Sequence, residues 1–157
     1  MSERSTDRLD QLLKGYERRK QEETRVQVER ALKLDEDRRK GAELLRRFVL
    51  YPARDFVLRV TEAGHRVLHH ELMDAFPPSI RIHLWPRGGP LDDGVPSRST
   101  LEFVWGDPDR DRLCVKHWTS EGLDKLTIQS SARAEELSEA WCHDQLYTFV
   151  SETLERA

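Results

Sequence analysis

The chain has 157 residues, enough for one domain with an additional helix, and its formal net charge of −3 points to neither a nucleic-acid nor a membrane partner. Hydrophobic residues make up only 37% of the chain and charged residues 35%, and no apolar run approaches the roughly 18 residues of a membrane span. The N-terminus lacks the apolar segment of a secretory signal, so we expect a soluble, cytoplasmic protein.

The first third of the chain predicts one long helix. Ser5 or Thr6 can cap its start, and Pro52 disfavours a helical conformation at Tyr51, so the helix should end at about Leu50. Residues 1–50 carry 14 basic and 11 acidic side chains. We call this segment the helical arm; glycine costs stability inside a helix, and Gly41 marks a possible break.

Apolar residues in the arm fall into three patches, within residues 9–16, 26–34 and 44–49, separated by charged segments. A continuous coiled coil needs an apolar residue every three to four positions, so a coiled coil is possible but poorly specified. The alternative is a solvated helix whose last third packs on the domain that follows.

Residues 51–157 predict an α+β domain with a six-stranded, mainly antiparallel sheet and a C-terminal helix packed on one face. The hairpin around the turn Gly106–Asp111 is the clearest element, and a second turn is expected at Ser120–Gly122. Pro86–Arg98 reads as a long loop, and Ser130 or Ser131 should cap a final helix that ends near Glu155. The predicted strands are 54–61, 66–72, 79–85, 99–105, 112–118 and 125–129.

Side chains alternate between the two faces of a strand, and this alternation separates an apolar face from a polar one. Ile80, Ile82 and Leu84 share one face, and the residues between them share the other. The polar face combines basic and aromatic side chains, which are enriched in binding surfaces, although it could equally be an ordinary amphipathic cover. Arg81 and Lys116 could hold an anion there. The candidate binding residues are Arg59, Arg81, His83, Trp85, Lys116 and Trp118.

Motifs for catalysis, metals and cofactors are not evident. His69 and His70 are adjacent in a predicted strand and should point to opposite faces, so they cannot share one metal without distortion. Cys114 and Cys142 form no CxxC pair. We therefore predict no catalytic residue, no metal site and no cofactor.

These features favour a non-enzymatic interaction or assembly module whose helical arm mediates self-association, such as a homodimer, or binding of a protein partner. One alternative is a small ligand-binding domain or enzyme that uses the polar sheet face and the 86–98 loop. Another is nucleic-acid binding through stacked aromatic residues, against which the acidic charge of residues 51–157 argues.

Overall fold

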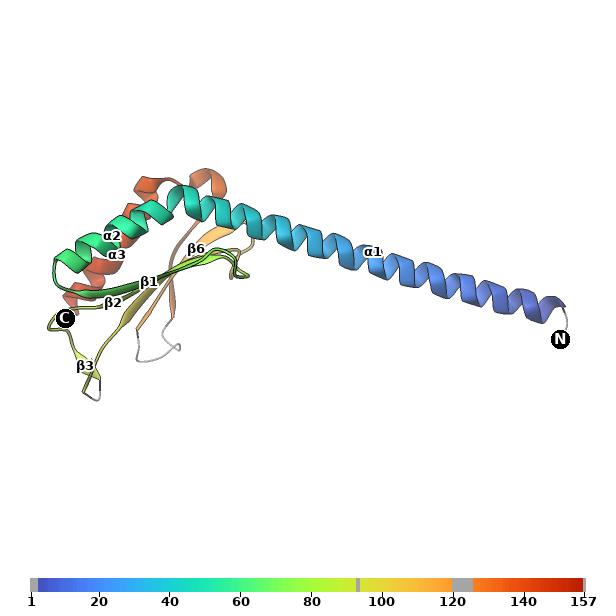
Figure 1. Cartoon of the computed structure of the whole chain (residues 1–157), viewed down its shortest axis with the longest axis horizontal. Coiled ribbons are helices and arrows are strands. Elements are labelled where there is room, and N and C mark those ends of the chain that lie inside the picture. Colours follow the sequence, from blue (N-terminus) through green and yellow to red (C-terminus); the bar gives the residue numbers. More distant parts are fainter. Residues whose placement is uncertain (1–2, 93, 120–125, 157) are drawn as a thin grey trace. The chain divides into compact units, whose positions relative to one another are not determined.

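The computed structural model describes residues 3–92, 94–119 and 126–156 (Figure 1). The chain divides into two compact units, Met1–Asp37 and Arg38–Ala157, which we call the N-terminal and C-terminal units. Helix α1 spans Glu3–Phe48, so its last turns belong to the C-terminal unit.

A second helix, α2 (Leu50–Glu62), follows α1 almost without interruption. Pro52 explains the boundary, because it has no N–H to donate to the carbonyl of Phe48 and its ring crowds that carbonyl. In the first turn of α2 the missing donor has no cost, since N–H groups there lack intrahelical partners. Helix α1 thus ends close to the predicted position, but the expectation that Pro52 keeps Tyr51 out of a helix is wrong, because Tyr51 lies in α2.

The predicted strand 54–61 is wrong, because these residues lie within α2. Strand alternation would bury Leu58 together with Phe56 and Val60, but Leu58 is 64% exposed. The buried residues Ala53 and Val60 are seven positions apart, two helical turns, which places them on one side of the helix. Phe56 and Val60, four residues apart, share one side of the helix and Leu58 points away from them, so three alternating apolar residues were too short a pattern to exclude a helix.

The sheet has five strands, and every neighbouring pair is antiparallel. This arrangement confirms the predicted α+β fold class, with one strand fewer because residues 54–61 are helical. A two-stranded ladder, β3 (Leu91–Asp92) with β4 (Val95–Pro96), forms within the predicted 86–98 loop. The order in the sheet is β1 (Arg66–Leu72), β2 (Ser79–Trp85), β5 (Ser99–Trp105), β6 (Arg112–Thr119) and β7 (Thr127–Arg133).

The final helix begins later than predicted. Strand β7 continues through Ser130 and Ser131, and a 3₁₀ turn at Ala134–Glu136 precedes helix α3 (Glu139–Glu155). Ser138 is the cap, because its hydroxyl accepts a hydrogen bond of 3.0 Å from the Trp141 N–H. The predicted turn at 120–122 lies outside the described residues.

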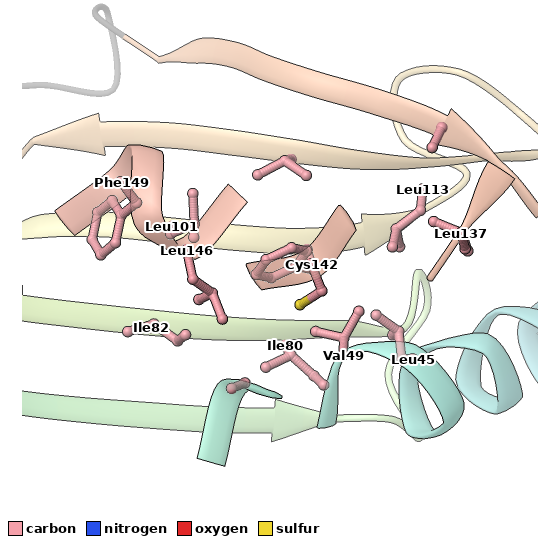
Figure 2. Packing of buried hydrophobic residues seen from close by; sticks show 14 of the residues in the cluster. Leu45, Val49, Ile80, Ile82, Leu101, Leu113, Leu137, Cys142, Leu146 and Phe149 are labelled. Carbon is pink, nitrogen blue, oxygen red and sulfur yellow. The ribbon is translucent and has the colours of Figure 1, made fainter. Parts of the chain in front are cut away.

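Helices α2 and α3 cover the same face of the sheet (Figure 1). Leu45 of α1 and Val49, the N-cap of α2, join this core, where Cys142, Leu146 and Phe149 of α3 meet side chains of the strands (Figure 2). Within the described part of the chain, no helix is both long and apolar enough to cross a membrane.

Gly41 allows α1 to pass close to the sheet. A methyl group at this position would lie 2.5 Å from Cδ1 of Trp105, a buried residue at the end of β5. Gly15 has no atom within 4 Å of the same position on its own α-carbon. Helix α1 passes through both glycines without a break.

The two glycines form a matched pair for a stability test. Gly41→Ala should destabilise the fold by about 1–3 kcal/mol, because Trp105 must move out of a filled site. Gly15→Ala should stabilise α1 or leave it unchanged, since alanine is favoured over glycine in an open helix position. Urea unfolding followed by circular dichroism measures both changes, and an unaffected Gly41→Ala variant would contradict the close packing.

Candidate functional site

The sheet face opposite α2 and α3, which we call the polar face, carries five of the six predicted binding residues. Arg81, His83 and Trp85 lie on β2, and Lys116 and Trp118 lie on β6, with β5 between these strands. Register places Arg81 and Lys116 on either side of Glu102, and His83 and Trp118 on either side of Thr100. The structure thus brings these five side chains to one surface.

Arg59 is not part of this surface, and its predicted placement on a strand is wrong. It lies on α2, where its guanidinium pairs with Asp55 at 2.9 Å. Together with Phe56 and Tyr147 it lines an open groove between α2 and α3. The error follows from the mistaken strand at 54–61, because the alternation rule assigned Arg59 to a sheet face.

The two cations expected to hold an anion already have carboxylate partners. Arg81 Nε donates to Glu102 Oε2 at 2.8 Å, and Lys116 Nζ donates to Asp107 Oδ2 at 2.8 Å. Glu102 is only 7% exposed, so its carboxylate depends on Arg81 for compensation. An anionic ligand would have to compete with these internal pairs.

Trp118 is covered by other side chains of the same face. It is 8% exposed, and the Arg81 guanidinium carbon lies 5.6 Å from its ring centroid. A second stack of this kind joins Arg66 to Trp85 at 4.6 Å. Arginine over an aromatic face is favourable and also shields the ring from water. In this arrangement Trp118 does not present an open wall.

His83 is held in its neutral form at physiological pH. Burial lowers its pKa to about 4, and the positive charges of Arg98, His70 and Arg81 act in the same direction. Its Nδ1 lies 2.8 Å from the Thr100 hydroxyl, and its ring meets that of His70 edge to face at 5.4 Å. His83 is therefore a hydrogen-bonding group rather than a cation on this surface.

A pocket of about 410 Å³ lies at the base of the 86–98 loop, beside the last turn of α3. Thr119 and Arg156 line both this pocket and another of about 230 Å³ that reaches His117 and Glu152. Four of the lining residues carry hydroxyl groups, and Arg156 is a cation. The residues that line the first pocket are Pro86, Pro90, Ser97, Ser99, Thr119, Thr153 and Arg156.

His117 is the titratable group at the bottom of this region. It is 5% exposed, its Nδ1 lies 3.3 Å from Glu152 Oε2, and its ring packs edge to face on Phe149 at 5.1 Å. Burial lowers the pKa of His117, an effect that the Glu152 carboxylate opposes. Its Nε2 is buried and has no hydrogen-bond partner among the residues that the structure describes.

Sequence reasoning missed this pair for a definite reason. Alternation along β6 places His117 on the same face as Leu113 and Val115, which is correct. Glu152 lies on α3, and the contact depends on how that helix sits on the sheet, which alternation cannot supply. The one feature of the sequence that pointed to this site was a histidine, His117, predicted on the apolar face of a strand.

The structure gives little support for a reactive cysteine or for a metal site. Burial raises the pKa of Cys142 to about 12 and also raises that of Cys114, so neither thiol is a ready nucleophile. Among the described residues, no cluster of three or more histidine, cysteine or acidic side chains is arranged to bind a metal ion.

Comparisons with protein-family models, with curated proteins and with solved structures find no match to this chain. Its function is therefore inferred from the geometry.

The Arg81–Glu102 pair allows a direct test of how closed the polar face is. Arg81→Met should lower the free energy of unfolding by about 1–3 kcal/mol, because it leaves the buried Glu102 carboxylate without a partner. Adding Glu102→Gln to that variant should recover much of the loss, since the uncompensated charge is then gone. Urea unfolding at pH 7 provides the measurement. An Arg81→Met variant as stable as the wild type would mean that water reaches Glu102 and that the face is open.

Proposed function

We propose that this protein is a non-enzymatic assembly module that self-associates through the N-terminal unit of α1. The proposal rests on one observation: apolar side chains of this unit are exposed along its length, with Leu12 at 70%. Monomeric proteins seldom leave apolar residues clustered in this way unless the surface binds something. The exposed residues are Leu9, Leu12, Leu13, Tyr16, Val28, Leu32 and Leu34.

Ion pairs within α1 support a helix that presents these residues. Lys20 pairs with Glu23 at 3.2 Å, and Arg25 pairs with Glu22 and with Glu29. Spacings of three and four residues place the partners on neighbouring turns, where opposite charges favour the helical conformation. The charged segment between the two apolar patches can thus stay helical without a core of its own.

Burial of the exposed side chains would supply the driving force for association. A leucine moved from water into an interface contributes about 1.5–3 kcal/mol, so a few of these residues from each copy are enough to offset the cost of bringing two chains together. The C-terminal unit has its own hydrophobic core, and none of these exposed side chains belongs to it.

Light scattering coupled to size-exclusion chromatography tests the proposal. The wild-type mass should rise from monomer toward dimer as concentration increases, and Leu9→Asp should keep the chain monomeric because it places a charge in the apolar patch. Leu58→Asp is the matched control, since Leu58 is also an exposed leucine but lies on α2 of the C-terminal unit. A wild-type chain that stays monomeric at every concentration would refute the proposal.

The pocket beside the 86–98 loop favours a second candidate, binding of a small anionic ligand. Arg156 would attract the anion, the hydroxyl groups would donate hydrogen bonds, and the unpaired Nε2 of His117 would serve as an additional polar contact. The candidate does not use the polar face, where the cations are paired internally.

Inorganic phosphate is a suitable probe for this second candidate. An anion bound next to His117 stabilises the imidazolium form, so saturating phosphate should raise the pKa of His117 in an NMR titration. Arg156→Gln should abolish that increase, whereas Arg133→Gln, which removes an exposed arginine outside the pocket, should preserve it. A His117 pKa that is the same with and without phosphate would eliminate the candidate.

A further inference from the structure

One face of α1 in the N-terminal unit carries apolar and charged residues in a regular series. Beginning at Leu9, positions at alternating spacings of four and three residues share this face, because two helical turns take about seven residues. We call this series the seam. It consists of Leu9, Leu13, Tyr16, Lys20, Glu23, Gln27, Arg30 and Leu34.

Contacts in the structure confirm that the central seam residues share one face. Lys20 Nζ lies 5.6 Å from the centroid of the Tyr16 ring and 3.2 Å from Glu23 Oε2. Lys20 and Glu23 remain more than half exposed despite these contacts. Leu9, Leu13 and Tyr16 are about half exposed as well.

We propose that the seams of two copies pair in an antiparallel coiled coil, with Lys20 of each copy opposite Glu23 of the other. The inference rests on the proposed self-association and specifies its partner, a second copy of this chain, and its orientation. In coiled coils, polar residues at seam positions determine register and orientation, and the seam of α1 has two opposite charges at its centre.

Charge complementarity selects the antiparallel arrangement over the parallel one. In parallel pairing each seam residue meets its own copy, so Lys20 would face Lys20, Glu23 would face Glu23, and Arg30, also on the seam, would face Arg30. Like charges at an interface are repulsive and costly to desolvate. Antiparallel pairing about a point between Gln21 and Glu22 replaces the central repulsions with two Lys20–Glu23 pairs.

The same register matches the remaining seam positions. Leu9 lies opposite Leu34, so each end of the coiled coil has an apolar contact. Leu13 lies opposite Arg30, whose aliphatic stem can cover the leucine while its guanidinium stays in water. The charged segment that interrupts the apolar pattern therefore becomes the centre of the interface.

Charge reversal tests the central pairs. Lys20→Glu should shift the mass from dimer to monomer in light scattering, because it creates two Glu–Glu contacts, and adding Glu23→Lys should restore the dimer. Arg25→Glu is the matched control, since it also removes intrahelical ion pairs but lies on the opposite side of the helix. In a parallel dimer Lys20→Glu changes only the sign of one like-charge layer, so an unaffected dimer would overturn the inference.

Cysteine crosslinking tests the orientation independently of charge. A mixture of Leu9→Cys and Leu34→Cys chains of different tags should form a mixed disulfide under mild oxidation, and neither variant alone should crosslink, because only the mixture brings two thiols together. The wild-type chain is the control, since Cys114 and Cys142 are buried. Symmetric disulfides from a single variant would show a parallel dimer and overturn the orientation while leaving self-association intact. A chain that is monomeric in light scattering would refute the self-association itself.

Discussion

Strand β5 is buried on both faces, and the rest of the C-terminal unit is organised around that constraint. All seven of its residues are buried, although it lies in a sheet with helices on one side only. On the helix side, Leu101 and Phe103 enter the apolar core. On the other side no described helix covers the strand, so long side chains from β2 and β6 have to do so.

The cover on the polar face explains its composition. Arg81 reaches across to Glu102 and over the ring of Trp118, and His83 binds Thr100. The Arg81–Glu102 and His83–Thr100 contacts join neighbouring strands at positions that the register places side by side, whereas the Arg81–Trp118 contact reaches from β2 across β5 to β6. A surface rich in arginine and tryptophan is thus consistent with a second, polar layer that shields a central strand, as well as with a binding site.

Much of the sheet follows from the sequence because strand alternation is a local rule. Ile80, Ile82 and Leu84 are buried and the residues between them face the other way, as their spacing predicts. Residues 54–61 show where the rule fails, since Phe56, Leu58 and Val60 alternate as in a strand but lie in a helix that leaves Leu58 exposed. The N-cap of α3 shows a second limit. A serine in the sequence can cap a helix only where the preceding strand has ended, and the sequence does not show that β7 continues through Ser130 and Ser131. The cap is therefore Ser138.

The candidate sites were predictable only in part. Which face of a strand a side chain occupies follows from its position in the sequence, but which side chain it pairs with depends on the tertiary arrangement. Alternation placed Arg81, His83, Lys116 and Trp118 together. It could not show that the two cations are already paired, since that depends on the turn that brings Asp107 to Lys116 and on the register that sets Glu102 beside Arg81. The His117–Glu152 contact depends on the placement of α3 on the sheet, so the sequence pattern could not predict it either.

The two units use charged residues in opposite ways, and this contrast leads to the proposed assembly. On the polar face of the C-terminal unit, charged side chains pair with one another and lie over aromatic groups, as Arg81 does over Trp118. In the N-terminal unit, Lys20, Arg25 and their partners pair along one helix and cover none of its leucines. A single helix has no second layer on which to bury an apolar face, and such layers are how proteins stabilise amphipathic elements. A second copy of the same helix can supply that layer, and the order of charges along the seam allows it to do so without like-charge contacts at the centre.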